Sequence, residues 1–299
     1  MFSPLSPGSL SGVFVPFATP FHADGSLALE AVAPLIEYLL DSGVTGLVVA
    51  GTTGEGYALT ACERHELLSE AIHVSAGRVP VLCGVGGTNT ADAVAQATTA
   101  RQCGAHGMMV AAPAYCLPTP EELAQHVLAV VTAGELPTVL YDYPARTGVQ
   151  FDAATLDVLA PHPLVIGIKE ASGDLDRLPM LATYAGDLAV VSGSDTLAMH
   201  YLAAGATSWI AGFGNVLPAE HVAMVSAAVA GDLAAGWAVQ ERLSPILTNV
   251  ESGRYNAKVK AGLQLRGFAV GPTRPPIAPL EGAELAELRD QLAALGHGS

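Results

Sequence analysis

The chain carries little charge, and lysine is especially scarce in it. Only 14% of its 299 residues are charged, and three of the 13 basic side chains are lysines: Lys169, Lys258 and Lys260. The formal net charge of -15 at pH 7 and the isoelectric point near 4.8 argue against a basic surface. Nucleic acids and anionic membranes require such a surface, so we expect neither as a partner.

Several sequence signatures are also missing. The nine histidines form no H-E-x-x-H or comparable pattern, so we expect no metal site, and no other cofactor is indicated. The four cysteines form no C-x-x-C pair and no dense framework, so we expect free thiols. These cysteines are Cys62, Cys83, Cys103 and Cys116.

Segments for membrane insertion or export are not indicated either. No run of about 18 or more purely apolar residues occurs, so we expect no membrane span. The N-terminal stretch MFSPLSPGSLSGVFVPF has no Lys or Arg before its apolar part, which makes it a poor secretion signal. These absences predict a cytoplasmic protein.

Short β-rich runs alternate along the chain with longer Ala- and Leu-rich segments. The intervening segments, such as LEAVAPLIEYLLDSG, repeat apolar residues at the three- and four-residue intervals of a helix, and many close on Gly. Strands that are apolar on both faces and alternate with helices indicate a parallel sheet covered by helices. The runs are GVFVPF (12–17), GLVVAG (46–51), PVLCGV (80–85), GMMVAA (107–112), TVLYDY (138–143), VIGIK (165–169), LAVVSG (188–193) and SWIAGF (208–213).

Eight such units in about 200 residues fit a (β/α)8 TIM barrel. A doubly wound open sheet is the alternative, but no G-x-G-x-x-G follows the first strand, which disfavours a dinucleotide fold. After Phe213 only helical segments follow, joined by the Pro-rich connector GPTRPPIAPLEG (271–282). We therefore predict a barrel over residues 1–230 that carries the active site, and a C-terminal helical appendage over residues 231–299.

The stretch VIGIKEASGD, residues 165–174, places Lys169 at the end of an apolar strand. Burial disfavours the charged form of an amine, so the lysine pKa falls and the neutral amine can attack a carbonyl to form a Schiff base. The alternative is a structural lysine paired with Glu170. Successive strand side chains point to opposite faces, which makes that pairing awkward.

Other polar groups stand at neighbouring strand ends, where a TIM barrel carries its active site. Tyr141 is either a proton shuttle for Schiff-base chemistry or an ordinary rim tyrosine. Thr52 and Thr53 are either turn hydroxyls or a loop whose N–H groups face a carboxylate. Arg146 is either a surface charge or a carboxylate clamp. Asp195 is the one obvious carboxylate base among these strand ends.

Three motifs in order resemble the dihydrodipicolinate synthase/N-acetylneuraminate lyase family of class I aldolases: GTTGE (51–55), YDYPARTG (141–148) and GIKEASG (167–173). The resemblance runs from GVFVPFATPF (12–21) to AVGPTRPP (269–276). It implies a barrel with a C-terminal helical appendage and a pyruvate-dependent Schiff-base lyase with a small-molecule substrate. It also implies a homo-oligomer, either a dimer or a tetramer.

The resemblance assigns catalytic roles to four residues. Lys169 forms the imine with pyruvate, and Tyr141 is the proton shuttle beside it. Thr52 relays protons to that phenol. Tyr115 matches a tyrosine that reaches across a dimer interface to complete the relay.

The resemblance also assigns substrate-binding residues. The backbone of Thr52 and Thr53 holds the pyruvate carboxylate, and Gly193 and Ile210 line the site. Arg146 matches the arginine that, in the synthase type, binds the carboxylate of aspartate semialdehyde. This feature favours condensation of pyruvate with aspartate semialdehyde.

Some positions depart from the synthase pattern. Asp142 replaces an asparagine, and SGSD (192–195) replaces SGDD. Compared with the family pattern, the pocket through which lysine inhibits many bacterial synthases is missing, so we expect inhibition by lysine to be absent or weak. Its aligned positions are Tyr57, Ala61, Arg64, Thr88, Asp92 and Ala114. The alternatives are a 2-keto-3-deoxy sugar acid aldolase or dehydratase and, outside catalysis, a barrel that only binds an oxo acid.

Overall fold

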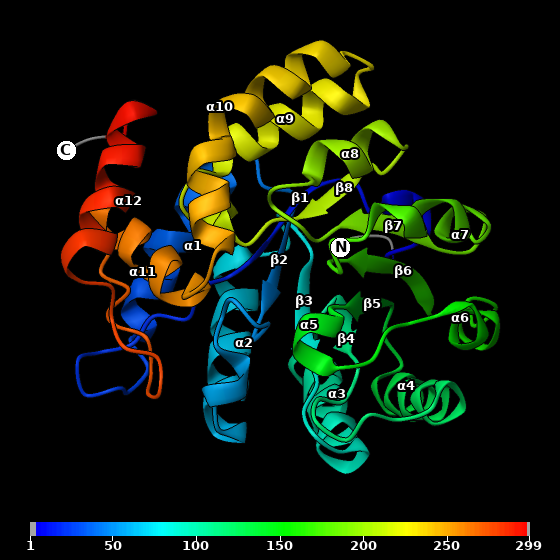
Figure 1. Ribbon diagram of the computed structural model, residues 1–299. Helices are drawn as coiled ribbons and strands as arrows, with labels where there is room; N and C mark the ends of the chain where they lie inside the picture. The colour runs from blue at the N-terminus through cyan, green and yellow to red at the C-terminus, as the bar shows by residue number, and fades with distance from the viewer. Residues whose placement is uncertain (1–3, 298–299) are drawn as a thin grey trace.

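Eight parallel strands close into a barrel in the computed structural model, which describes residues 4–297 (Figure 1). Each strand pairs with its chain neighbours, and the last pairs with the first. This closure confirms the predicted (β/α)8 fold and excludes the open sheet. The strands are β1 (Gly12–Pro16), β2 (Gly46–Val49), β3 (Val81–Val85), β4 (Gly107–Ala111), β5 (Thr138–Asp142), β6 (Val165–Glu170), β7 (Ala189–Ser192) and β8 (Ser208–Ile210).

Helices surround the barrel and continue beyond it. Several begin at side-chain caps: Thr60 and Glu63 form a capping box, as do Thr119 and Glu122. The helices are α1 (Val32–Asp41), α2 (Ala61–Ser75), α3 (Thr90–Cys103), α4 (Pro120–Gly134), α5 (Pro144–Thr147), α6 (Ala153–Leu159), α7 (Leu178–Ala182), α8 (Ala198–Ala203), α9 (Pro218–Val229), α10 (Leu233–Glu251), α11 (Tyr255–Leu265) and α12 (Gly282–Ala294).

Several strands end earlier than their apolar runs. The run at 46–51 stops pairing at Val49, because Ala50 adopts a left-handed backbone with φ of 57° and turns the chain out of the sheet. The run at 208–213 gives a strand only to Ile210. The residues beyond these ends form loops over the carboxyl end of the barrel, where the predicted site residues lie.

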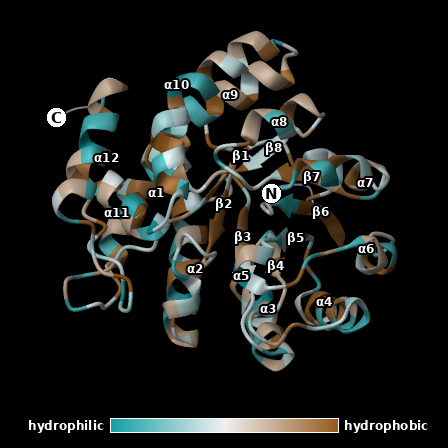
Figure 2. Cartoon of the chain, viewed as in Figure 1, coloured by the Kyte–Doolittle hydropathy of each residue, from teal (hydrophilic) through white to brown (hydrophobic). Residues whose placement is uncertain are grey.

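The strands bury side chains on both faces, as their continuous apolar runs predict. One set, which includes Phe14, Val48 and Leu82, packs inside the barrel. A larger set packs between the strands and the helices, as Val49 and Cys83 do. Figure 2 shows hydrophobic residues along β2 and a mixture of hydrophobic and hydrophilic residues on the surrounding helices. The two packed layers fix the strand ends and the groups that they carry.

The C-terminal helices lie to one side of the barrel, with α12 beside α11 (Figure 1). The buried Lys260 on α11 ties this region to the GTTGE loop. Its Nζ donates to the carbonyl oxygens of Val270 and Pro272, at 2.9 and 3.2 Å, and lies 3.7 Å from Glu55 Oε1. The predicted boundary between the barrel and the C-terminal appendage near residue 230 stays a prediction. The outer ends of these two regions, residues 1–3 and 298–299, lie outside the described residues.

Within residues 4–297 no helix combines the length and apolarity needed to cross a membrane. All four cysteines are free thiols. The same part of the chain contains no cluster of three or more His, Cys, Asp or Glu side chains suited to a metal ion.

Candidate active site

Lys169 lies on β6 directly beside Tyr141 on β5, because the two residues are register partners in the sheet. The lysine is only 6% exposed, and its Nζ lies 4.3 Å from the centroid of the Tyr141 ring. Burial lowers the pKa of Lys169 to about 8, although the negative charge of Asp195 opposes this. The neutral, nucleophilic form of this amine is therefore far more populated near neutral pH than that of an ordinary lysine, although the ammonium stays the major form.

The structural alternative for Lys169, a pair with Glu170, does not occur. The Glu170 side chain faces the opposite side of β6, where its Oε2 lies 2.8 Å from Arg177 Nε. Asp142 on β5 joins the same buried pair, with its Oδ2 2.6 Å from Arg177 Nη2. The acidic residue next to the lysine thus belongs to a separate ion cluster outside the barrel interior.

Tyr141 is a buried phenol that stays protonated. Burial raises its pKa to about 12, against the opposing effects of the Arg146 charge and a hydrogen bond with Thr52. A neutral hydroxyl next to an amine can donate and accept protons in turn, which is what a shuttle requires.

Thr52 and Thr53 lie in a tight turn after β2. Gly54 and Gly56 permit this turn, since a Cβ at these positions would approach the backbone oxygens of Phe17 and Ala50 to 2.5 and 2.0 Å. The Thr52 carbonyl oxygen accepts a hydrogen bond of 2.9 Å from Asn256 Nδ2, which anchors the turn to α11.

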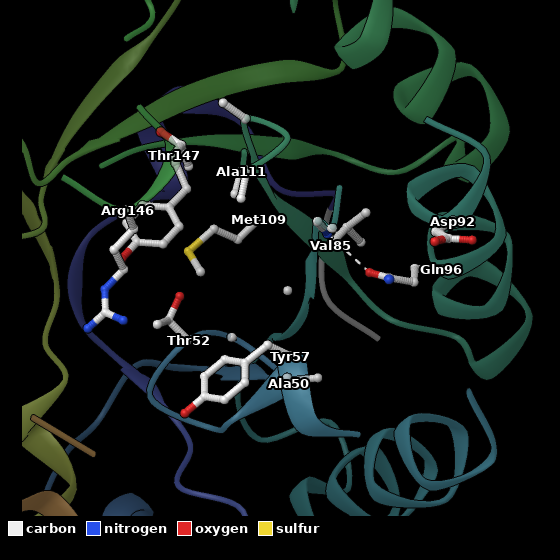
Figure 3. A pocket seen from close by; sticks show the side chains of 18 of the residues that line it. Ala50, Thr52, Tyr57, Val85, Asp92, Gln96, Met109, Ala111, Arg146 and Thr147 are labelled. Carbon is white, nitrogen blue, oxygen red and sulfur yellow. Dashed lines mark hydrogen bonds between the residues drawn. The ribbon is translucent and has the colours of Figure 1, made fainter. Parts of the chain in front are cut away.

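Two neighbouring cavities meet at Thr52 and Tyr141. The first, of about 590 Å³, runs from Thr52 and Arg146 to Asp92 and Gln96 (Figure 3). The second, of about 420 Å³, is lined by Lys169 and by the loop after β7. The side chains shared by both linings are Thr52, Tyr141, Tyr143 and Arg146.

Arg146, on the short helix α5, is exposed and lies at the same end of the first cavity as Thr52 (Figure 3). Its guanidinium carbon lies 5.3 Å from the centroid of the Tyr143 ring. No carboxylate within residues 4–297 forms a salt bridge with it. The planar guanidinium is therefore open to bind a substrate carboxylate.

The remaining predicted residues differ in position. Gly193 touches the lysine: a Cβ there would approach Lys169 Cγ to 2.9 Å. Ile210 is buried in the barrel interior and does not line either cavity. Tyr115 stands apart within this chain, 92% exposed and with a left-handed backbone at φ of 74°.

Five of the six positions aligned with the lysine-feedback pocket line the first cavity: Tyr57, Arg64, Thr88, Asp92 and Ala114. Arg64 is buried, and its guanidinium donates to the carbonyl oxygens of Gly84 and Gly56, at 2.6 and 2.9 Å. An arginine committed to the backbone in this way is not free to bind a ligand carboxylate.

Sequence reasoning missed three groups that the C-terminal region brings to the site. Glu251, Tyr255 and Asn256, at the turn between α10 and α11, line the second cavity. No pattern in the sequence marks them, because each lies at least 55 residues from the strand-end residue that it contacts.

A closed barrel that holds a buried, partly neutral lysine beside a protonated tyrosine at its carboxyl end defines a lyase of the class I aldolase type. Within that class, the chain belongs to the dihydrodipicolinate synthetase family, whose family model matches residues 9–295.

Curated relatives cover nearly the same length. The chain is 42% identical over 291 residues to a 4-hydroxy-tetrahydrodipicolinate synthase of Xanthomonas axonopodis pv. citri, spanning 96% of this chain and 94% of that one. It is 39% identical over 279 residues to the enzyme of that name from an Exiguobacterium species, spanning 93% and 95%.

Solved structures agree with the fold. A chloride-inhibited dihydrodipicolinate synthase from Acinetobacter baumannii, complexed with pyruvate, superposes with a TM-score of 0.93 at 30% identity, over 96% of this chain and 99% of that one. A monomeric dihydrodipicolinate synthase variant gives 0.93 at 32% identity, over 97% and 98%.

Proposed function

We propose that the chain condenses pyruvate with aspartate semialdehyde, the reaction of a 4-hydroxy-tetrahydrodipicolinate synthase. One observation carries the choice of the second substrate. Arg146 presents an unpaired guanidinium to both cavities, one of which holds Lys169. An aldehyde that bears a carboxylate would place its anionic end on this arginine and its carbonyl carbon near the lysine.

In this proposal the neutral Lys169 amine attacks the ketone carbon of pyruvate, and loss of water gives a protonated imine, the iminium. Loss of a proton from the pyruvate methyl group then gives an enamine, whose carbon attacks the aldehyde. Tyr141, assisted by Thr52, delivers a proton to the new alkoxide. The backbone of Thr52 and Thr53 holds the pyruvate carboxylate.

Turnover tests the proposal directly. With pyruvate and aspartate semialdehyde, coupled to dihydrodipicolinate reductase, we expect NADPH loss with kcat/KM of about 10⁴ M⁻¹s⁻¹ or above.

Arg146→Gln should raise KM for the aldehyde by about tenfold or more, because a charge-assisted hydrogen bond to the carboxylate is lost. It should leave borohydride trapping of pyruvate intact. Arg101→Gln is the matched control, since Arg101 pairs with Glu135 on the outer helices. An unchanged KM in Arg146→Gln would contradict the clamp.

A second candidate is a 2-keto-3-deoxy sugar acid aldolase or dehydratase. It is favoured by the polar wall of the second cavity, where Ser194, Asp195 and Tyr255 offer groups that bind hydroxyls. Pyruvate trapping without turnover of aspartate semialdehyde would select this candidate. A protein that binds pyruvate but traps none on Lys169 would instead be an oxo-acid-binding barrel.

We also propose that the chain works as a homo-oligomer, a dimer or tetramer, in the cytoplasm. Three large side chains are exposed near the first cavity: Tyr57 at 56%, Tyr115 at 92% and Leu117 at 60%. Packing of a second copy on them would bury apolar surface and place the partner's Tyr115 at the relay.

Sedimentation tests the oligomer. We expect the wild type to sediment as a dimer or tetramer, and Leu117→Asp to shift it toward monomer with a fall in turnover, because a charge would be buried in the interface. Val158→Asp is the control, because Val158 is another exposed apolar residue, 50% exposed on α6. A fully active monomeric wild type would contradict the proposal.

A further inference from the structure

Asp195 is a buried carboxyl group in the same cavity as Lys169. It follows β7, is only 2% exposed and lines the second cavity together with the lysine. Its Oδ2 accepts hydrogen bonds from the Tyr255 hydroxyl and, at 3.3 Å, from the Phe213 N–H. Its Oδ1 has no hydrogen-bond partner in the part of the chain that the structure describes. A buried carboxylate oxygen without a partner is costly unless a bound group uses it.

The C-terminal region fixes this carboxyl group in place. Glu251, at the end of α10, accepts hydrogen bonds from the Asp195 N–H at 2.7 Å and from Ser194 Oγ at 3.2 Å. The Tyr255 ring lies where a side chain at position 212 would stand: a Cβ on Gly212 would approach Tyr255 Oη to 2.1 Å. The hydroxyl that holds Asp195 thus depends on a glycine in the loop after β8.

Asp195 is near Lys169 but not bonded to it. Within residues 4–297 the lysine forms no salt bridge. The two groups nevertheless act on each other electrostatically, since the carboxylate raises the pKa of Lys169 and the ammonium lowers the pKa of Asp195. Both groups line the cavity of about 420 Å³, which can hold the carbonyl group of a keto acid beside the amine.

We propose that Asp195 is a catalytic residue that accepts the proton Lys169 must lose before it attacks the keto acid, and that its carboxylate later serves as the counter-ion of the iminium. The inference rests on the proposed imine at Lys169 and deepens that function. Tyr255 is a positioning residue, because it acts through Asp195.

The proton balance closes without an external reagent. The ammonium of Lys169 gives a proton to the Asp195 carboxylate, and the neutral amine adds to the ketone carbon to form a carbinolamine. The C–O bond then breaks as the nitrogen lone pair forms the C=N bond. The departing hydroxyl takes up the stored proton, by way of the Tyr141 hydroxyl, and leaves as water. An iminium cation and the Asp195 carboxylate remain, with no net change of charge.

Burial gives Asp195 a suitable proton affinity. It raises the pKa to about 7 with a further rise from Glu251, while Tyr255, Lys169 and the Phe213 N–H oppose the shift. A group with a pKa near the working pH exchanges a proton with an amine more readily than the Tyr141 phenol, whose pKa is about 12. Among the described residues, the other titratable or charged groups that line this cavity are Tyr141, Tyr143, Arg146 and Arg254.

The test is the rate of pyruvate capture, measured by rapid mixing, borohydride quench and mass spectrometry at pH 5 to 9. Asp195→Asn should slow capture by about 10²-fold or more, because the proton acceptor and counter-ion are lost. In the variant, the acid limb of the plot of capture rate against pH, where the rate falls as Lys169 becomes protonated, should also move to lower pH. The reason is that the Asp195 charge, which raises the pKa of Lys169, has gone. A normal rate, or a slower rate with an unmoved acid limb, would overturn the proposal.

Two further variants guard against a merely structural effect. Tyr255→Phe removes one hydroxyl and should slow capture by about tenfold, and it should add nothing in the Asp195→Asn background, because both act on one group. Additive losses would overturn the positioning role. Asp142→Asn is the matched control, since Asp142 is also buried with a pKa near 7 but pairs with Arg177, so its acid limb should not move.

The same assay separates this inference from the function on which it rests. A wild type that captures no pyruvate would refute the imine itself. A wild type that captures pyruvate, with Asp195→Asn just as fast, would refute only the role of Asp195.

Discussion

Lys169→Met should abolish pyruvate capture and turnover, yet it should make the fold more stable. Methionine keeps the unbranched shape of lysine but has no amine, so no imine can form. Burial lowers the lysine pKa from 10.5 to about 8, which means that the folded state holds the charged amine at a cost. Removal of that cost should raise the free energy of unfolding by about 1–3 kcal/mol. Borohydride trapping and thermal unfolding measure the two effects.

Lys258→Met is the control for the Lys169 variant. Lys258 donates to the Asn249 carbonyl oxygen and, at 3.1 Å, to Ser252 Oγ, so it stabilises the turn after α10. The same substitution there leaves the Lys169 amine in place, so it should still allow borohydride trapping of pyruvate, while it should lower stability. Retained capture in Lys169→Met, or loss of stability in it, would show that the lysine is structural.

Tyr141→Phe should slow turnover by about 10²–10⁴-fold, the usual worth of a positioned acid or base. The substitution keeps the ring that lies 4.3 Å from Lys169 Nζ and removes only the hydroxyl. KM should change less than kcat, because the proton moves in the transition state rather than in the bound ground state. Steady-state kinetics of the coupled reaction measures both values.

Tyr201→Phe is the matched control for Tyr141→Phe. Tyr201 is also a buried phenol, and burial likewise raises its pKa, but it lies on α8 and lines neither cavity. Its loss of a hydroxyl should leave kcat near the wild-type value. A Tyr141→Phe enzyme as fast as Tyr201→Phe would move the shuttle role to another group.

The local parts of this architecture could be predicted from the sequence. Largely apolar runs of five or six residues located all eight strands, and alternation with helical segments indicated that they run parallel. Lys169 stood out because an amine at the end of a buried strand is unusual in a chain with so few lysines. Its neighbour Tyr141 followed from the order of the strands, since consecutive strands in a barrel lie side by side.

Contacts between distant segments could not be predicted in that way. The Asn256 amide binds the Thr52 carbonyl across 204 residues, and Tyr255 reaches Asp195 across 60. Hydrophobic periodicity places a helix but does not say which of its polar residues turn toward the barrel. The reason for the departure at Asp142 could not be predicted either, because its partner Arg177 comes only after the next strand, β6, in the sequence.

The turn between α10 and α11 makes the timing of synthesis matter. All eight strands precede residue 211, so the barrel sequence is complete while the last part of the chain is still being made. The groups that hold Thr52 and Asp195 from outside the barrel arrive only with Glu251, Tyr255 and Asn256. A nascent chain can therefore close its barrel before its catalytic loops are held in place. An mRNA truncated after the codons of the eighth strand would encode every residue proposed to form or bind the imine. It would not encode Glu251, Tyr255 and Asn256, which hold Asp195 and Thr52 in position.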